Sequence, residues 1–364
     1  MTHSRKLLIL LSVFFLVYSL PAGAVNLWGD ATVSVQRLEY DQAGLRNQSA
    51  GFRSMRSNLH FYHSVTPSLN TYVETHLNSR DDMTLNQVYA TYTSYSDILA
   101  IKLGRFELDY GMYDLFRTDN AQARDNSFVG NTLVDPHSTD NGVQATLFSE
   151  RFYVRGALTT GTDTPGFTRN RAFGKTFKFL HKPTPALKWS LSYYVSDQSL
   201  SSETGHFFVK PADEPYSGLG TDTRTSTHVT SSGSGQELQS FQFGMNYDIN
   251  PRWRTYVILG RLKDDTGVLK NTLDYANGAL VRSVSPVTEV GLQIGLASYE
   301  RIEGQITGVG VKRFQLAITR KLAKKTEFTV EYVDQQVDDS LRSLVTRRRP
   351  VGFSGFTAQL YVGF

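Results

Sequence analysis

The sequence predicts an all-β protein, a transmembrane antiparallel β-barrel of about 16 strands. Three observations support this prediction. Apolar and polar residues alternate along most of the chain, short and long connectors follow one another in turn, and charged residues occur on one side of several predicted strands. Alternation with a period of two is typical of strands whose two faces meet different surroundings. Together these features indicate one closed sheet.

The first 24 residues have the features of a secretory signal peptide. Arg5 and Lys6 precede the uncharged, mostly apolar run 7–20, and the small residues of 21–24 end in an A-x-A cleavage site. An N-terminal membrane anchor is the alternative, but this run is short for a helix that must span about 20 residues. The predicted domains are therefore a leader over 1–24 and one barrel domain over 25–364.

Composition excludes several other classes of protein. The 364 residues contain no cysteine, which excludes thiolate metal sites, disulfides and cysteine nucleophiles. A mean hydropathy of −0.30 argues against a helical membrane protein, although the chain holds 22 Phe and 19 Tyr. The net charge of +4 is too small to indicate nucleic-acid binding. The eight histidines show no metal-ligand spacing, and we expect neither a metal nor a cofactor.

Strand-like alternation recurs from the start of the mature chain to its last residue, and no stretch is a convincing amphipathic helix. The clearest segments are 30–36, 56–62, 71–77, 99–104, 188–196, 241–248, 313–319 and 356–364. The pattern is weaker near 270–310, where a strand pair can be drawn over roughly 275–284 and 289–302. The alternative counts of 14 or 18 strands therefore stay open.

The connectors come in two sizes that alternate along the chain. Short connectors with turn residues are 66–68, 96–97, 149–150, 183–185, 250–251, 285–286 and 322–325. Long polar connectors are 41–50, 107–140, 198–235 and 264–274. Antiparallel membrane barrels have this sidedness, with tight turns at one rim and long loops at the other.

A soluble secreted β-sandwich, propeller or barrel would also alternate, but its apolar face would point into a core. The predicted inward set here carries charges that tolerate neither a dry core nor lipid. Its members are Arg56, Glu74, Lys102, Lys178, Lys188, Arg254, Arg313 and Glu331. Aromatic residues gather toward strand ends, as in the girdles at the two membrane interfaces. We therefore expect an outer face in lipid and an inner face in water.

The end of the chain and one internal segment resemble known families. Leu360, Val362 and Phe364 place apolar or aromatic residues at every second position up to a terminal Phe. This pattern resembles the assembly signal of Gram-negative outer-membrane porins, and the whole mature chain is similar to that family. Residues 85–92, followed by 101–111 with their Gly-Arg-Phe sequence, are similar to the phosphate-selective O/P-type porins.

The resemblance implies a multi-pass protein of the Gram-negative outer membrane that is not an enzyme. It implies a water-filled channel for passive diffusion of ions and small hydrophilic solutes. The alternative is a substrate-specific channel for phosphate, other anions or sugars. It also implies a homotrimer that contacts outer-membrane lipid and lipopolysaccharide and is inserted by the outer-membrane assembly machinery. Arg347–Arg349, in the last long connector, are candidates for binding lipopolysaccharide phosphates or anionic solutes, and an ordinary solvated loop is the alternative. An outer-membrane enzyme, such as a lipase, is disfavoured by the apolar outward positions.

The connector 107–140 is the predicted constriction loop, because it follows the fifth strand and porins similar to this chain fold that loop inward. It carries seven acidic residues against two basic ones. An acidic loop facing a basic wall would set a transverse field that filters solutes by charge. The predicted constriction residues are Asp109, Asp114, Asp119 and Asp125 on the loop and Arg56, with Arg53 beside it, Lys102 and Arg313 on the wall. A solvated external loop is the alternative.

Overall fold

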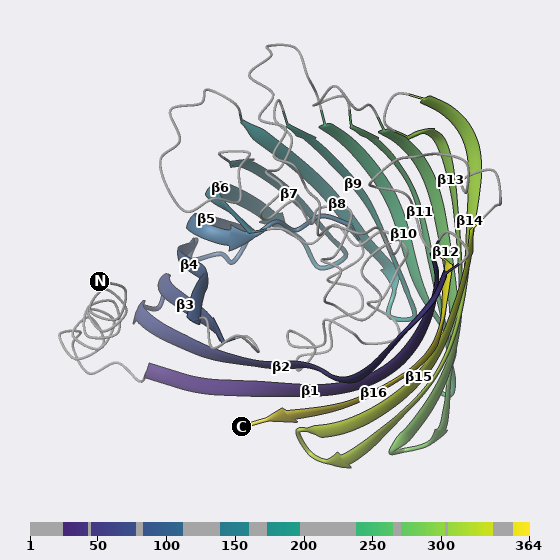
Figure 1. Cartoon of the computed structure of the whole chain (residues 1–364). Helices are drawn as coiled ribbons and strands as arrows, with labels where there is room; N and C mark the ends of the chain where they lie inside the picture. Colours follow the sequence, from purple (N-terminus) through teal and green to yellow (C-terminus); the bar gives the residue numbers. More distant parts are fainter. Residues whose placement is uncertain are drawn as a thin grey trace, which may run out of the picture.

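In the computed structural model the strands form one closed antiparallel sheet, drawn as a ring in Figure 1. The structure describes residues 25–42, 45–77, 83–111, 139–159, 173–196, 238–264, 271–302, 305–337 and 352–364. The predicted leader, 1–24, lies outside these residues. The closed barrel confirms the predicted fold class.

Sixteen strands make up the barrel, and each pairs with its neighbours in the sequence. They are β1 Val25–Gln42, β2 Leu45–Thr66, β3 Leu69–Leu77, β4 Met83–Thr93, β5 Leu99–Glu107, β6 Thr139–Phe148, β7 Phe152–Thr159, β8 Gly174–Thr184, β9 Leu187–Ser196, β10 Leu238–Asn250, β11 Trp253–Asp264, β12 Asn271–Ser285, β13 Thr288–Ile302, β14 Gln305–Ala323, β15 Thr326–Val337 and β16 Gly352–Gly363. The count of 16 is confirmed over 14 and 18. The weak region resolves into β12 and β13.

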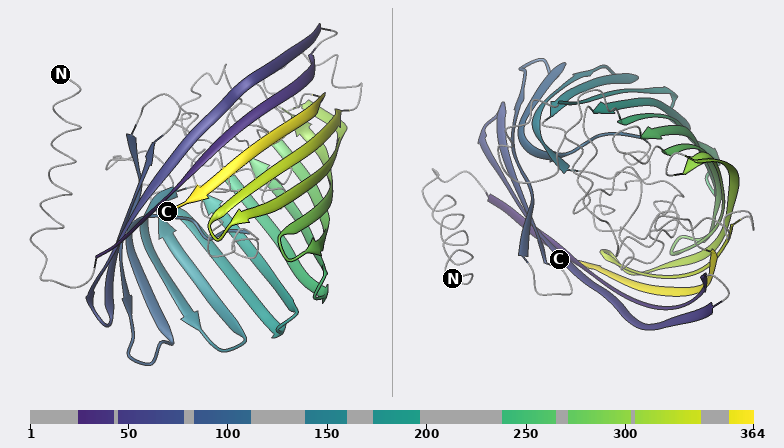
Figure 2. Two further views of the ribbon diagram at one scale, coloured as in Figure 1. Left: turned by 90° about the horizontal axis from the view of Figure 1, so that it is seen from below. Right: turned by 45° about the horizontal axis from the view of Figure 1, so that its top comes forward.

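The first and last strands close the ring. β1 and β16 lie side by side (Figure 2) and pair from Asp30↔Gly363 to Asp41↔Gly352. At the end of this seam the Gly29 N–H donates to the Phe364 carbonyl at 3.1 Å, and the Phe364 N–H donates to the Gly29 carbonyl at 2.8 Å. The predicted assembly-signal residues Leu360 and Phe364 are both exposed on the outside of the barrel. Their role in assembly stays a prediction.

One predicted connector is wrong. The long loop expected over 41–50 is mostly strand, because β1 continues to Gln42 and β2 begins at Leu45. Asp41 pairs with Arg46, and Gln42 with Leu45. Residues 41–50 are mostly polar and show no alternation of apolar and polar residues, so they were not predicted as strand. Backbone hydrogen bonds between strands do not need apolar side chains.

The two faces of the sheet differ as the alternation predicts. On β14, Phe314 and Ile318 are 39% and 50% exposed, whereas Gln315 between them is completely buried. Outward apolar side chains recur on most strands, and an outer apolar band of this kind is typical of a barrel in lipid. Exposed aromatic residues near the short turns are Tyr92, Tyr95, Phe148, Phe152, Tyr247 and Phe328. Their position at one rim matches an interfacial girdle.

The inner face is not polar throughout, which corrects the simple expectation of an inner face in water. Tyr256 and Ile258 of β11 and Val281 of β12 face inward and are buried. Tyr256, Val281 and Ala317 belong to one apolar cluster. Water therefore does not reach the whole inner wall. None of the described residues belongs to a helix long and apolar enough to cross a membrane.

Gly104, in the Gly-Arg-Phe sequence of β5, is required by its backbone geometry. Its φ is +132°, which side-chain-bearing residues rarely adopt. An added Cβ would lie 2.3 Å from the Val88 carbonyl oxygen and 2.8 Å from the Tyr89 Cα. Both atoms belong to the backbone of β4, so a flexible side chain cannot relieve the clash.

We predict that Gly104→Ala lowers the free energy of unfolding by about 2 kcal/mol, because it combines backbone strain with this clash. Urea unfolding of the refolded barrel in detergent measures the change. Gly278→Ala on β12 is the matched control, since a Cβ there meets nothing within 4 Å. Equal effects of the two substitutions would contradict the structural argument.

Candidate functional site

The chain leaves β5 at Glu107 and continues along the inside of the barrel. Leu108 and Tyr110 are 3% and 1% exposed, and Gly111 is also buried. We call residues 107–111 the lumen segment. It is the first part of the predicted constriction loop, and its course agrees with the expected inward fold. Residues 112–138 of that loop, which include Asp114, Asp119 and Asp125, lie outside the described residues.

Asp109 joins the lumen segment to the basic inner wall of β7 and β8. Its Oδ2 accepts from Arg155 Nη1, and its Oδ1 accepts from Lys178 Nζ. The Tyr153 hydroxyl donates to Oδ2 at 3.4 Å. The side chains of Asp109 and Lys178 are 5% and 0% exposed. We call Asp109, Tyr153, Arg155 and Lys178 the Asp109 cluster.

The register of the sheet explains why a carboxylate is held at this point. Arg155 and Lys178 are direct cross-strand partners in the β7–β8 pair. Like charges opposite each other destabilise a sheet, and one carboxylate between them reduces that repulsion. The ring of Tyr153 also stabilises the two cations, because Arg155 lies over it at 4.9 Å and Lys178 at 5.8 Å from its centroid. Within the cluster, both cations bond to the carboxylate of Asp109.

A second attachment holds the lumen segment to β10. The Tyr110 and Ser240 hydroxyl oxygens are 2.5 Å apart, which makes a short hydrogen bond. Gly111 has a φ of +72°, and an added Cβ would lie 2.2 Å from Gln242 Oε1. Gln242 in turn donates from Nε2 to the Tyr275 hydroxyl of β12 at 3.0 Å. The lumen segment is thus held to the wall at two places, by Asp109 at β7 and β8 and by Tyr110 at β10.

The predicted site residues are only partly brought together. Asp109 bonds to Arg155 and Lys178, neither of which was among the predicted constriction residues. Lys102 faces inward from β5 and lies over the Tyr89 ring at 4.3 Å. Arg313 is buried on β14, far from β7 and β8 in the strand order, and donates from Nε to Gln335 Oε1 at 2.9 Å.

The side chains of Arg53 and Arg56 lie outside the described residues, so their predicted place on the wall stays a prediction. Lys178 belonged to the predicted inward set but not to the predicted constriction. Arg155 was missed, although the sequence holds a signal for it. In Phe152–Thr159 the residues Tyr153, Arg155, Ala157 and Thr159 share one face by the period of two.

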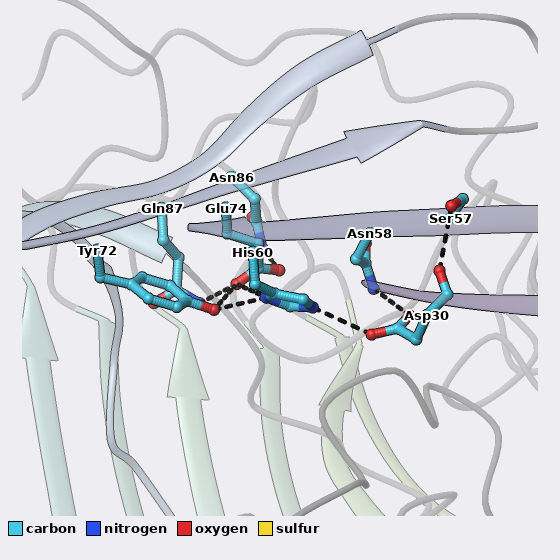
Figure 3. Close-up of polar contacts among 8 residues, drawn as sticks. All are labelled: Asp30, Ser57, Asn58, His60, Tyr72, Glu74, Asn86 and Gln87. Carbon is cyan, nitrogen blue, oxygen red and sulfur yellow. Dashed lines mark hydrogen bonds and ion pairs between the residues drawn. The ribbon is translucent and has the colours of Figure 1, made fainter. Parts of the chain in front are cut away.

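A second polar group lies on the inner wall of β1–β4 and is drawn in Figure 3. His60 Nε2 is 3.0 Å from Asp30 Oδ2, and His60 Nδ1 is 2.7 Å from the Tyr72 hydroxyl. Tyr72 donates to Glu74 Oε2 at 3.0 Å. Trp28 stacks on the His60 ring at 5.3 Å between centroids. We call Asp30, His60, Tyr72 and Glu74 the His60 network.

Amides surround the two carboxylates of the His60 network. Asn58 Nδ2 donates to Asp30 Oδ1 at 3.0 Å. Asn86 Nδ2 donates to Glu74 Oε1 at 2.9 Å, and Gln87 Nε2 donates to Glu74 Oε2 at 2.6 Å. No local sequence pattern marks His60 as part of such a network, because its partners lie on other strands. Within the described ranges, no three His, Asp or Glu side chains are arranged to hold a metal ion.

We predict that Tyr110→Phe lowers the free energy of unfolding by about 1 kcal/mol, because it removes the bond to Ser240 and leaves that hydroxyl in a buried place. Urea unfolding in detergent is the measurement. Tyr95→Phe is the matched control, since Tyr95 is 93% exposed on a short turn. A loss no larger than that of the control would show that the hydroxyl contact does not hold the segment.

Comparisons with known proteins show similarity of fold. No protein-family model matches the sequence, and no curated protein is similar to it in sequence. The anion-selective porin from Comamonas acidovorans has a TM-score of 0.62 at 13% identity, covering 94% of this chain and all of that one. OmpT, an outer membrane protein of Vibrio cholerae, in its trimer form has a TM-score of 0.60 at 13% identity, covering 94% and 100%. The outer membrane channel DcaP of Acinetobacter baumannii has a TM-score of 0.60 at 10% identity, covering 94% and 97%. The chain has the 16-strand barrel fold of these outer-membrane proteins.

Proposed function

We propose that the protein is an outer-membrane porin, a water-filled channel for passive diffusion of ions and small hydrophilic solutes. The observation that carries the proposal is a closed 16-strand barrel with an apolar outer face and a charged inner face, along which the lumen segment runs. Barrels of this strand number leave an aqueous lumen. Closure pairs the backbone groups around the ring, which allows the wall to stand in lipid.

The same geometry supports a location in the outer membrane of a Gram-negative bacterium, in contact with its lipid and lipopolysaccharide. Insertion by the assembly machinery through Leu360, Val362 and Phe364 follows from the resemblance of the last strand to porins. A homotrimer is part of the proposal, and the trimer form of the OmpT neighbour supports it. The leader over 1–24 would direct export to this location.

Charge on the inner face supports a filter that acts on ions. Cations face inward from β5 to β9, namely Lys102, Arg155, Lys178 and Lys188. Carboxylates face inward from β15, β1 and β3, namely Asp30, Glu74, Glu327 and Glu331. Asp140 on β6, Arg313 on β14 and the ion pair between Arg254 of β11 and Glu289 of β13 do not follow this separation. Opposite charges on two arcs of the wall produce a transverse field that selects solutes by charge.

An anion-specific channel is the second candidate, and the Asp109 cluster favours it. Arg155 and Lys178 place two cations side by side on the inner wall next to Asp109, and such cations attract phosphate or another anion. The similarity of residues 85–92 and 101–111 to the phosphate-selective O/P-type porins points the same way, as does the fold neighbour described as an anion-selective porin.

Single-channel recording in planar bilayers with asymmetric KCl tests both candidates. We expect stepwise conductance from the purified, refolded chain. Absence of any conductance would overturn both channel functions. Saturable block by inorganic phosphate would favour the specific channel, whereas conductance that rises linearly with phosphate concentration would favour the general porin.

We predict that Asp109→Asn shifts the reversal potential toward anions, because it removes the carboxylate and leaves the two cations. Loss of this buried pairing should also cost about 3 kcal/mol of unfolding free energy. Asp97→Asn is the matched control: it makes the same charge change on a short turn, where the φ of 53° suits Asn. An unmoved reversal potential in Asp109→Asn would show that the cluster does not control selectivity.

A further inference from the structure

Two arginines lie on the outer face of the barrel at its short-turn end. Arg282 is near the end of β12 and Arg320 is near the end of β14. By the period of two, each shares a face with an outward apolar neighbour, Leu280 at 37% and Ile318 at 50% exposure. Both arginines are themselves exposed. The two cations therefore mark the level at which the apolar outer band ends toward the short turns.

The register of the sheet places the two arginines on either side of β13. Arg282 pairs with Val290, and Arg320 pairs with Thr288, the next residue along the same face of β13. From the spacing between strands and the rise along a strand, the Cα atoms of the two arginines are about 12 Å apart. Two arginine side chains that converge over β13 can therefore reach one group of the size of a phosphate.

Trp253 orients one of these arginines. It is the first residue of β11 and the direct cross-strand partner of Arg282. The Arg282 guanidinium carbon lies 5.2 Å from the centroid of the Trp253 ring, which is a cation–π contact. An arginine stacked on a ring keeps its N–H edge available, and that edge matches two oxygens of a phosphate. Tryptophan is also enriched at the level of the lipid headgroups. We call Trp253, Arg282 and Arg320 the rim site.

Among the described residues, no carboxylate bonds to the two cations of the rim site. Near the short turns of β11–β14, the acidic side chain in the described ranges is Glu289, which faces inward and bonds to Arg254 at 2.6 Å. The loop end of the same strands differs. There Arg261 faces outward and lies 3.7 Å from Asp274 and 2.8 Å from Glu300. Outward cations are thus paired with carboxylates at the loop end, whereas those at the short-turn end are left for an external anion.

We propose that the rim site binds the phosphate of an anionic phospholipid at the membrane interface near the short turns, with Arg282 and Arg320 as its two cationic ligands. The inference rests on the proposed outer-membrane location and goes beyond the channel function, which uses the inner face of the wall. Basic clusters at a membrane interface bind lipid headgroups in this way. The acyl chains of the bound lipid lie along the apolar band that begins at Leu280 and Ile318. Charge at the headgroup and apolar contact at the chains together favour a lipid over free phosphate.

Native mass spectrometry of the refolded barrel in detergent tests the rim site, with phosphatidylglycerol as the probe. We expect Arg282→Gln and Arg320→Gln each to weaken binding of the tightest phosphatidylglycerol by roughly fivefold, and the double variant by roughly thirtyfold, as follows from the contribution of one basic residue near a lipid surface. Arg261→Gln is the matched control. It makes the same charge change on the outer face of β11, but at the loop end, and should bind the lipid as the wild type does.

Trp253→Leu is a further variant that keeps both charges. Loss of the ring removes the cation–π contact of Arg282, and we expect the affinity for the lipid to fall by roughly threefold. In the wild type, which needs no substitution, the affinity should fall as ammonium acetate is raised, because salt screens surface charges. Unchanged lipid binding in the double variant overturns the proposal, and so does wild-type binding that does not respond to salt. An equal loss in Arg261→Gln also overturns it, because general surface charge then explains the binding. Displacement of the lipid by an equal concentration of inorganic phosphate overturns the assignment to a lipid.

Conductance measurements separate this inference from the channel function. In bilayers of phosphatidylcholine the double variant should conduct as the wild type does, because the rim site lies on the outside of the wall. A wild type that does not conduct overturns the channel function, while the lipid titration still decides the rim site. A conducting double variant with undiminished affinity for phosphatidylglycerol overturns the rim site alone.

Discussion

The constraint on which the structure depends is that lipid offers no hydrogen-bond partner to the backbone. Every N–H and C=O at membrane depth must therefore be paired within the protein. An open sheet would leave two unpaired edges, and the pairing of β1 with β16 removes them. Because closure satisfies the backbone, the side chains are free to differ completely between the two faces.

The inner face of the barrel carries charged side chains. Arg155 and Lys178 lie opposite each other on neighbouring strands, a pairing that would be unfavourable without a partner of opposite sign. The lumen segment supplies that partner with Asp109. The same few residues are bonded to β4 through Glu107, to β7 and β8 through Asp109, and to β10 through Tyr110. A short segment fixed at three places on the wall has little freedom to move away from it.

The fold follows from local pattern much further than the site does. Period-two alternation and the two sizes of connector are local properties, and they were enough to predict 16 strands, including the weak pair that became β12 and β13. The polar hairpin around Asp41 and Arg46 was taken for a loop, because its strands carry no apolar face to signal them. Asp109 could be predicted from its place after the fifth strand.

The partners of these residues could not be predicted in the same way. Which cations contact Asp109 depends on the path that residues 107–111 take inside the barrel. No local sequence pattern records that path. The His60 network joins residues from four strands, and its contacts depend on the registers of β1–β2, β2–β3 and β3–β4 together. Each register includes or adjoins a bulge, and a shift of one residue turns a side chain to the opposite face.

The lumen segment connects the two charged arcs of the wall. Glu107 is bonded through Gln87 to the carboxylate of Glu74, on the arc that carries Asp30 and Glu74. Asp109 is bonded to the arc that carries Arg155 and Lys178. Two residues of extended chain span only about 7 Å, so a movement of Glu107 cannot be absorbed before it reaches Asp109. The position of the carboxylate in the basic arc is therefore set partly by the bond between Glu107 and Gln87, and the field across the lumen depends on both ends of this one segment.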